Sequence, residues 1–187
     1  MRIFLYFFTV LIFISCSKNI VSERDSKNRK LVGKMVNNQK QGVWRYYDEK
    51  DRLYMKSSFK NNVETGTSKV YHENGKLRQI GKIDNGKQVG SWKFYHQNGK
   101  FYGKGNLVNG KMDGKWIWYF NNGQLHTIRH YADGRLLNVD FSKNRKGETI
   151  ESGSFKNENG QLIIYETQSE KDSVEYILNY KNGLIVP

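Results

Sequence analysis

Four histidines are the side chains best suited to proton transfer or metal binding in this chain. His72 and His96 lie 24 residues apart and each follows a tyrosine, which makes them one position of a repeat and favours surface residues at strand ends. His126 and His130 lie four residues apart, and in a strand this spacing puts them on one face, roughly 13 Å from each other. A single metal ion cannot easily bind both without further ligands. We therefore predict no metal site.

Three carboxylates, those of Asp140, Glu148 and Glu151, could in principle supply the acid and the base of a glycosidase. They occur where a regular pattern in the sequence has faded, and a charged stretch on a solvated strand is the favoured interpretation. The chain has no Ser-His-Asp order, no phosphate-binding loop and no dinucleotide fingerprint. We predict no catalytic residues and no cofactor, and hence a protein that is not an enzyme.

The only cysteine, Cys16, directly follows an apolar stretch near the start of the chain. Residues 3–14 are apolar except for Thr9, and they follow Arg2, as in a secretory signal. The stretch is short for a membrane span, which needs about 20 apolar residues. We predict a signal peptide over residues 1–15 that is removed. A single cysteine also excludes a disulfide within the chain.

The residues Phe13-Ile14-Ser15-Cys16 resemble the lipobox of bacterial lipoproteins. The resemblance implies that Cys16 receives a diacylglycerol and becomes the mature N-terminus, so that acyl chains anchor the protein to a membrane. An ordinary secretory signal or an uncleaved anchor is the alternative. Residues 16–30 would then form the lipidated cysteine and a flexible polar tether. We expect a cell-envelope location, exposed to the periplasm or the cell surface, and Ser17 favours the outer over the inner membrane.

A period of 24 residues runs through the rest of the chain and is its most specific feature. Glycines, tyrosines and tryptophans each return at this spacing, with Ser68 in the place of one tryptophan. The members of these columns are Gly42, Gly66, Gly90 and Gly114; Tyr47, Tyr71, Tyr95 and Tyr119; Trp44, Trp92 and Trp116; and Gly75, Gly99 and Gly123. Two Asn-Gly or Asp-Gly steps fall in each regular period, and such a step between alternating runs predicts a type I′ hairpin turn. Two strands per repeat follow.

The aromatic positions indicate how these strands pack. Under the two-residue alternation of a strand, a tryptophan and the aromatic residue two places further share one face, and the column tyrosine lies on the other. Repeated hairpins place like residues side by side, so we expect aromatic ladders on both faces. We predict regular repeats over residues 31–137, followed by degenerate repeats and a C-terminal cap over residues 138–187.

The unit Gly90-Ser91-Trp92-Lys93-Phe94-Tyr95-His96-Gln97-Asn98-Gly99-Lys100 resembles the MORN repeat, in its bacterial variant of about two dozen residues per unit. The resemblance covers about residues 31–160 and is weaker beyond. It implies an all-β fold, an elongated and twisted antiparallel sheet of consecutive β-hairpins, used as a scaffold or as a contact surface near a membrane. Some bacterial members are antitoxin-like, but an exported lipoprotein cannot neutralise a cytosolic toxin.

The charge of the chain favours anionic partners. Lysine and arginine number 31 against 18 aspartate and glutamate, a net charge of +13, which suits lipid head groups, acidic polysaccharide or nucleic acid. We expect no nucleic acid, because an exported protein meets little of it. The cations near the predicted turns would form a basic rim, comprising Lys76, Lys87, Lys100, Lys111, Lys115 and Arg135. Lysines also keep a sheet soluble and guard its edges, so charge alone leaves both interpretations open.

Two functional hypotheses remain. The leading one is a non-enzymatic envelope lipoprotein that acts as a repeat-based interaction scaffold for a protein or an anionic envelope polymer. The alternative is an antitoxin-like immunity protein that neutralises a toxin or hydrolase within the envelope.

Overall fold

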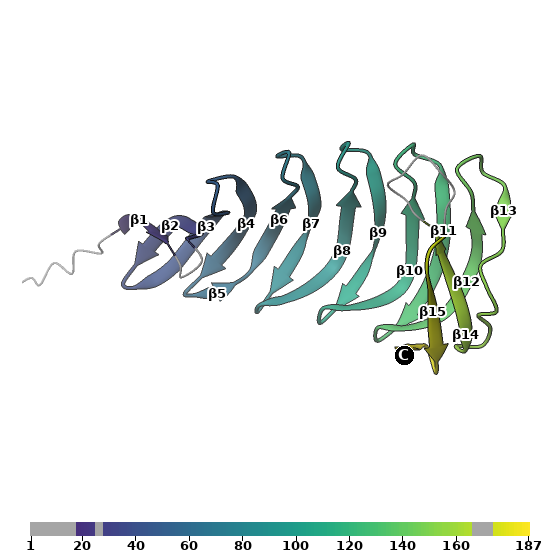
Figure 1. Ribbon diagram of the computed structural model, residues 1–187. Helices are drawn as coiled ribbons and strands as arrows, with labels where there is room; N and C mark the ends of the chain where they lie inside the picture. Colours follow the sequence, from purple (N-terminus) through teal and green to yellow (C-terminus); the bar gives the residue numbers. More distant parts are fainter. Residues whose placement is uncertain (1–17, 25–27, 166–173) are drawn as a thin grey trace, which may run out of the picture.

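The protein is an elongated row of curved β-hairpins (Figure 1). The computed structural model describes residues 18–24, 28–165 and 174–187. The strands are β1 (Lys18–Arg24), β2 (Lys30–Val36), β3 (Gln39–Tyr47), β4 (Leu53–Lys60), β5 (Val63–Glu64), β6 (Gly66–Tyr71), β7 (Leu77–Asp84), β8 (Lys87–Tyr95), β9 (Phe101–Val108), β10 (Lys111–Tyr119), β11 (Leu125–Ala132), β12 (Arg135–Lys143), β13 (Thr149–Ile150), β14 (Gly160–Tyr165), β15 (Val174–Lys181) and β16 (Leu184–Val186). The predicted signal peptide and Cys16 lie outside the described residues.

Strand order in the main sheet follows chain order. Thirteen strands form one antiparallel sheet from β1 to β13, with β5 paired only to β4, and β14, β15 and β16 form a second sheet of three strands. The predicted all-β array of consecutive hairpins with two strands per repeat is confirmed. In the described part of the chain, no helix has the length and apolar character needed to cross a membrane.

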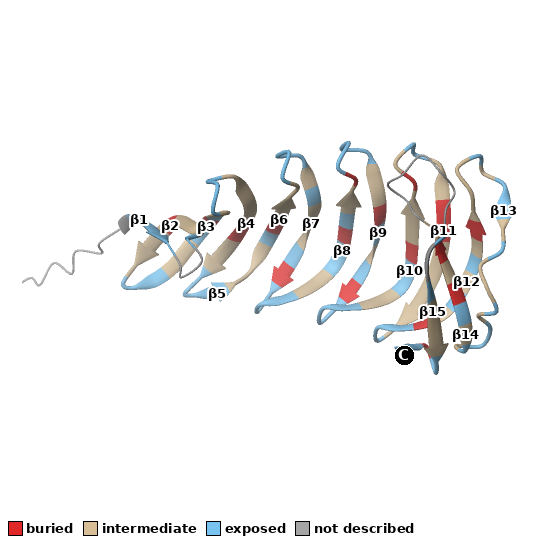
Figure 2. Cartoon of the chain, viewed as in Figure 1, coloured by how far each residue is buried: buried red, intermediate tan, exposed pale blue. Residues whose placement is uncertain are grey.

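The core consists mainly of tryptophans that lie over glycines of the neighbouring strand. Trp92 and Trp116 are almost fully buried, and a Cβ atom added to Gly81 or Gly105 would fall within the rings of these two tryptophans. The pairing of β9 with β10 explains this overlap, because three residues of β10 lie opposite the single residue Gly105 of β9. We call this arrangement a glycine–tryptophan crossing. Figure 2 shows the buried segments recurring at mid-strand along the array.

Each crossing requires a bulge in the strand that carries the tryptophan. The first of the three β10 residues that lie opposite Gly105 is Gly114, with a φ of 68°, and its counterpart in β8 is Gly90, with a φ of 67°. This left-handed conformation favours glycine, since a Cβ is strained there. The bulges bend the strands, which gives each hairpin the arched shape seen in Figure 1. The column of glycines that includes Gly90 and Gly114 therefore marks the positions where the strands bend.

One repeat lacks its crossing. Ser68 replaces the tryptophan, and Ser57 replaces the glycine that would face it across β4 and β6. Both serines are buried, and the Ser57 hydroxyl donates a hydrogen bond to the carboxylate of Glu64. The two replacements are mutually consistent, because a side chain at the glycine position leaves no space for an indole ring.

The two long edges of the sheet use different turns. At one edge, both central residues have positive φ, for example 51° at Asn109 and 82° at Gly110, which is the predicted type I′ geometry. At the other edge the type I′ prediction is wrong for Asn74-Gly75, Asn98-Gly99 and Asn122-Gly123, because only the glycine has positive φ. At this edge, three loop residues lie between the two residues that are joined by a backbone hydrogen bond. The loop is a type I turn followed by a glycine in the left-handed conformation.

Successive turns of this second edge are joined by side-chain hydrogen bonds. The Asn98 amide Nδ2 donates to the carbonyl of Asn121 at 2.9 Å, while Asn98 Oδ1 accepts from the backbone N–H of Lys100. Asn74 makes the equivalent bonds in the preceding turn, to the Gln97 carbonyl at 2.7 Å and from the Lys76 N–H. These asparagines are therefore fixed by bonds that link one repeat to the next, rather than by turn conformation.

The two ends of the array differ. Residues 18–24 were expected to lie in a flexible tether, but they form β1, which pairs along its length with β2; that expectation is wrong for these residues, since β2 offers them a free edge to pair with. At the C-terminal end, the predicted boundary at residue 138 falls inside β12. The sheet of β14, β15 and β16 lies beside β12 (Figure 1) and buries Leu136, Leu162 and Ile164.

Candidate binding surface

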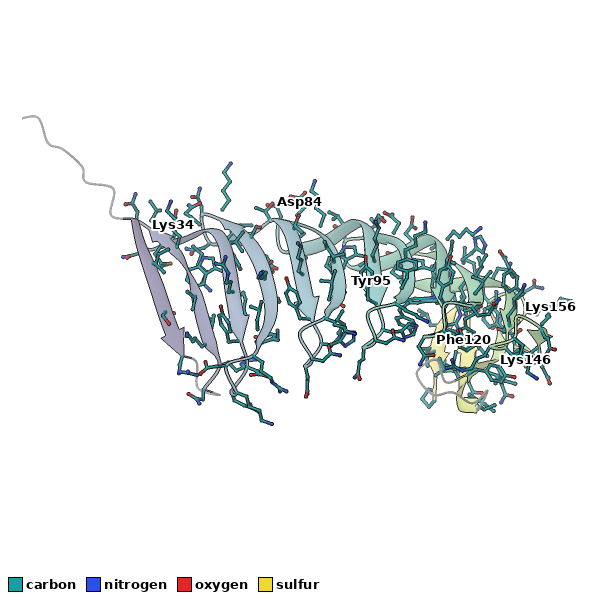
Figure 3. All side chains as sticks on the ribbon, turned by 90° about the horizontal axis from the view of Figure 1, so that it is seen from above. Lys34, Asp84, Tyr95, Phe120, Lys146 and Lys156 are labelled. Carbon is teal, nitrogen blue, oxygen red and sulfur yellow. The ribbon has the colours of Figure 1, made fainter. Side chains whose placement is uncertain are left out.

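The two faces of the main sheet differ in chemistry. One face, here the tryptophan face, carries the buried tryptophans together with Phe94 and Trp118, which pack against Trp116. The opposite face, here the lysine face, carries the residues that alternate with these in each strand, among them Lys93 and the column tyrosines. Side chains project from both faces when the sheet is seen from above (Figure 3).

A row of cations crosses the lysine face from strand to strand. Each residue of the row is directly opposite the next, and five of the six positions from β3 to β9 are basic. From β3 to β9 the row reads Arg45, Lys56, Lys69, Ile80, Lys93 and Lys104. Neighbouring strands lie about 4.8 Å apart, so these six positions span about 24 Å along the array. We call the five basic residues the cation row.

The cation row places like charges in direct cross-strand pairs. Arg45 faces Lys56, Lys56 faces Lys69, and Lys93 faces Lys104. Directly opposed like charges destabilise a sheet, and no carboxylate of the described residues forms an ion pair with any of the five. The arrangement therefore lowers stability and leaves a strip of uncompensated positive charge.

Beyond Lys104 the row becomes apolar. Ile117, Ile128 and Phe141 continue it on β10, β11 and β12. Near the edge of the same face, the rings of Tyr95 and Phe101 lie 5.8 Å apart in an edge-to-face arrangement. The Phe101 ring also lies 5.4 Å from the ring of Tyr119 in the next repeat, so the aromatic ladder expected on this face is present here.

The predicted basic rim is largely used for contacts within the array. Lys76 Nζ and Lys100 Nζ each donate to a backbone carbonyl of the next turn. Lys111 forms an ion pair with Asp133 at 2.9 Å, and Arg135 forms one with Glu158 at 3.3 Å. Lys87 and Lys115 are exposed. Four of the six rim cations thus join repeats, whereas the cation row lies in the middle of the strands.

The histidine positions differ from the surface role expected for them. His96 is fully buried and His72 partly buried. The His96 Nε2 lies 2.9 Å from the carbonyl oxygen of Tyr119, and His72 makes the same contact with Tyr95 at 2.8 Å. A carbonyl only accepts, so each Nε2 carries a proton and donates it. The prediction of surface histidines is wrong, because these rings join one turn to the next.

His126 and His130 have separate environments despite their spacing. Burial, and then the charges of Arg129 and Arg145, lower the pKa of His126 from 6.5 to about 3. His130 is partly exposed, with Nε2 3.0 Å from the carboxylate of Asp140. Within the described ranges, no three His, Cys, Asp or Glu side chains gather in a way that could hold a metal ion.

The three carboxylates considered for catalysis have different neighbours. Asp140 contacts His130 and accepts a hydrogen bond from the Asn138 amide. Glu148 accepts a hydrogen bond from the Asn144 amide at 2.7 Å within its own turn. The backbone carbonyl of Glu151 accepts from the Tyr165 hydroxyl. The carboxylates of Asp140 and Glu148 thus take part in local contacts, whereas at Glu151 the contact is made by the backbone.

The cation row was missed from sequence, although a signal for it existed. Arg45, Lys69 and Lys93 recur every 24 residues, each directly after the position of the column tryptophan. Lys56 and Lys104 belong to a second column, in which isoleucine alternates with lysine. What the sequence did not show was that the bulges bring the two columns opposite each other.

Comparison with known proteins agrees with this architecture. The family model described as MORN repeat variant matches residues 64–85, 88–109 and 112–133. No curated protein matches the chain. MORN repeats generally take part in interactions with proteins or membranes, and they are generally not catalytic. The centre of this array, residues 64–133, thus consists of three consecutive repeats that match the MORN repeat variant.

Proposed function

We propose that this protein is a non-enzymatic interaction scaffold of the bacterial cell envelope, which binds an anionic envelope polymer along its lysine face. The observation that carries the proposal is the cation row, with three like-charged cross-strand pairs and no acidic partner among the described residues. A soluble sheet needs exposed lysines, but it does not need them in direct opposition.

The division between the two faces supports this function. The tryptophan face supplies the packing that holds the hairpins together, so residues of the lysine face are free to serve contact rather than stability. Repetition extends the same contact along the array, as in other repeat proteins. A linear polyanion lying across the strands would place its charges against successive cations and relieve their repulsion.

The lipid anchor is the second part of the proposal. A diacylglycerol on Cys16, with the signal peptide of residues 1–15 removed, would hold the array at the membrane, the outer membrane in preference to the inner. Only one residue separates Cys16 from β1, which starts at Lys18. The array would therefore stand close to the bilayer rather than at the end of a long tether.

Retention on a polyanion tests the lysine face. We expect wild-type protein to be retained by immobilised polyphosphate and by a purified envelope polysaccharide fraction, with retention falling steeply as salt increases. The triple variant Lys56→Gln, Lys69→Gln, Lys93→Gln should lose at least about tenfold in affinity, equivalent to about 1.4 kcal/mol.

The matched control removes the same charge elsewhere. Lys60, Lys87 and Lys146 are exposed lysines near turns, and replacing these three with glutamine should leave retention close to that of wild type. Equal losses in the two triple variants would mean that net charge alone attracts the polymer, and the proposed surface would be wrong.

Labelling with a fatty acid tests the anchor. Cells given an alkyne-tagged palmitate should incorporate the tag into wild-type protein but not into Cys16→Ala, which should move from the membrane to the soluble fraction. Crosslinking in intact cells, followed by pull-down of both forms, then identifies what the array contacts. A tagged Cys16→Ala protein, or an untagged wild type, would reject lipidation at this residue.

A further inference from the structure

One repeat has lost its aromatic side chains on the tryptophan face. In the repeat of β6 and β7, Ser68 stands where three other repeats have tryptophan, and Val70 stands where they have tyrosine, phenylalanine or tryptophan. Arg78 follows in the column that holds Tyr54 and Tyr102. These three replacements lie in one repeat and on one face. They leave open a space that aromatic rings occupy in the neighbouring repeats.

A cavity of about 510 Å³ lies beside this repeat. Its lining comes from β4, β6, β7 and the turns at one edge. The residues are Asp48, Arg52, Tyr54, Val70, Tyr71, His72, Glu73, Asn74, Arg78 and Gln97. Two of the three replaced positions, Val70 and Arg78, are among them, so the loss of aromatic volume and the cavity coincide. We call it the Arg78 cavity.

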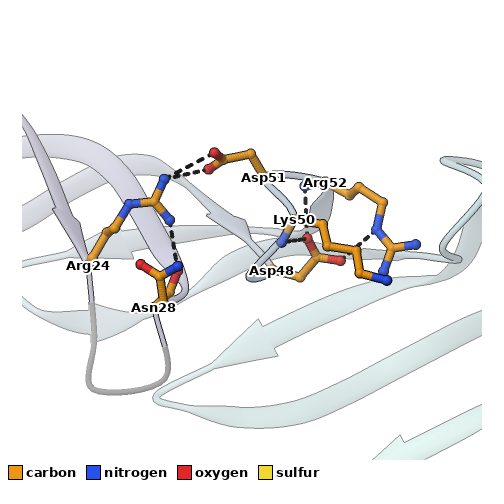
Figure 4. A network of polar contacts seen from close by, with 6 residues as sticks. All are labelled: Arg24, Asn28, Asp48, Lys50, Asp51 and Arg52. Atoms are coloured by element: carbon orange, nitrogen blue, oxygen red, sulfur yellow. Dashed lines mark hydrogen bonds and ion pairs between the residues drawn. The ribbon is translucent and has the colours of Figure 1, made fainter.

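One wall of the Arg78 cavity is held by an ion-pair network. Asp48 accepts hydrogen bonds from the backbone N–H of Lys50 and of Arg52, and pairs with Arg52 Nε at 2.8 Å (Figure 4). These contacts lower the pKa of Asp48, the backbone bond from Arg52 most of all. Arg52 also pairs with Glu73 of the next repeat at 3.0 Å. The guanidinium of Arg52 is thus already shared between two carboxylates.

Figure 4 also shows how this wall is tied to the N-terminal end of the array. Arg24 donates to both carboxylate oxygens of Asp51, at 2.9 and 3.0 Å, and to the backbone carbonyl of Asn28. Asp48 and Asp51 belong to one turn, whose conformation is therefore fixed from both sides. A turn held in this way presents its carboxylates in one geometry.

Arg78 differs from Arg52 in having no acidic partner. It is exposed, and no carboxylate of the described residues forms an ion pair with it. Its planar guanidinium is suited to bidentate binding of a carboxylate. The Arg78 cavity therefore combines one uncompensated guanidinium with carboxylates that still have oxygen lone pairs available.

An aromatic side completes the cavity. Tyr54 lines it and lies 6.2 Å from Tyr46, ring centre to ring centre. Burial, reinforced by the nearby Glu64 charge, raises the pKa of Tyr46 to about 12, so this phenol stays neutral. An aromatic ring beside polar groups suits the apolar face of a sugar ring, whose hydroxyls need acceptors and donors around it.

We propose that the Arg78 cavity binds a carboxylate-bearing sugar, a uronic acid unit of an acidic glycan. The Arg78 guanidinium takes the sugar carboxylate, the Tyr54 ring packs against the sugar ring, and Glu73 and Gln97 form hydrogen bonds with its hydroxyls. This site lies on the tryptophan face and goes beyond the proposed function, which concerns the cation row on the opposite face.

Titration of ¹⁵N-labelled protein with monosaccharides, followed by NMR, tests the site. Glucuronic acid should shift backbone amides of β6, β7 and the adjoining turns in a saturable way, and it should bind at least about tenfold more tightly than glucose, which lacks the carboxylate. Glucose 6-phosphate is the second comparison. Binding of glucose as tight as that of glucuronic acid, or binding of the phosphate sugar alone, would overturn the proposal.

Arg78→Tyr restores the residue found at two equivalent positions and removes the guanidinium. It should abolish the glucuronic acid shifts while leaving thermal unfolding unchanged or improved, and Arg78→Met provides a second variant if the tyrosine disturbs the fold. Arg78→Lys keeps the charge but loses the bidentate fork, so it should bind with intermediate affinity. Unchanged binding in Arg78→Met would reject the site.

The lysine-face triple variant separates this proposal from the proposed function. Lys56→Gln, Lys69→Gln, Lys93→Gln should bind glucuronic acid as wild type does, because these side chains lie on the other face. Conversely, Arg78→Tyr should still be retained by immobilised polyphosphate. Loss of glucuronic acid binding in the triple variant would assign the sugar to the cation row and overturn the Arg78 site.

Discussion

Two neighbouring parts of the array solve the same packing problem differently. In the repeats from β7 to β10, tryptophans cross over glycines and an aromatic cluster fills the face. Across β4 and β6, the corresponding positions hold the buried residues Ser57 and Ser68 instead. Both parts keep the same turns and strand order. The fold is therefore set by turns and bulges, while the filling of the tryptophan face can change from repeat to repeat.

The difference also shows that glycine and tryptophan act as a pair. A crossing needs both, since the ring occupies the space of the missing Cβ. Where one is absent the other has gone as well, and the repeat gains a cavity beside Arg78. Regular repeats thus supply stability, and the aromatic-poor repeat supplies space for a ligand.

Gly105→Ala should have the largest effect on this contrast. The added Cβ would fall within the Trp116 ring, and moving a fully buried indole should lower the free energy of unfolding by about 3 to 4 kcal/mol. Urea denaturation measures the change. Ser57→Ala, at the matching position of the aromatic-poor repeat, should cost about 1 kcal/mol. Similar losses at the two positions would contradict the pairing of glycine with tryptophan.

Acid should destabilise the protein through His126, which lies on β11 next to the aromatic-filled repeats. Its pKa is about 3 in the fold, below its ordinary 6.5, so the unfolded chain takes up a proton first. Stability is complete above pH 6.5 and falls as the pH drops towards 3. The loss should reach about 2 to 3 kcal/mol between pH 6.5 and pH 4.5.

Urea denaturation across this pH range tests the assignment. His126→Tyr introduces the residue that Tyr54 and Tyr102 provide in the same column, and it should flatten this part of the pH profile. An unchanged acid profile in His126→Tyr would show that another group is responsible.

Transplanting a crossing into the aromatic-poor repeat tests whether the pair acts as a unit. Ser68→Trp alone should destabilise the protein, because the Ser57 side chain occupies the space that the ring needs. Adding Ser57→Gly should recover stability, with a favourable coupling of about 1 to 2 kcal/mol in a double-mutant cycle. Additive effects of the two substitutions would mean that the glycine and the tryptophan do not act as a unit.

The smallest expected effect concerns the turns that both parts share. Asn98→Ala removes the bond to the Asn121 carbonyl and the one from the Lys100 N–H, and it should cost about 1 kcal/mol. Asn74→Ala removes the equivalent bonds beside the aromatic-poor repeat and should cost the same. Thermal melting compares the two, and a much smaller cost for Asn74 would show that its repeat is held less firmly at this edge.

The architecture could be predicted because each column has a local cause. Asn109-Gly110 specifies its turn through backbone conformation alone, and Gly114 marks a bend for the same reason. The turn at Asn98-Gly99 shows the limit of this reasoning. Its sequence is equally compatible with type I′, but bonds to the next repeat select a different geometry. A contact between repeats is not visible in a single dipeptide.

The binding surfaces were harder to predict for the same reason. His96 was expected at the surface, yet its ring bonds to the carbonyl of Tyr119, 23 residues later. Lys56 and Lys69 become neighbours only because β4 pairs with β6 in one register. Arg78 was not singled out, although its departure from the Tyr54 and Tyr102 column was a readable signal.

Strand order that follows chain order has a mechanical consequence. Each strand from β1 to β13 is bonded only to strands near it in sequence, so tension applied at the N-terminus loads the outermost ladder and releases hairpins one after another. Such unzipping needs less force than shearing long strands in parallel, and each step frees about one repeat of chain. An array of this kind would lengthen stepwise under load and reform when the load ends, as an extensible link does.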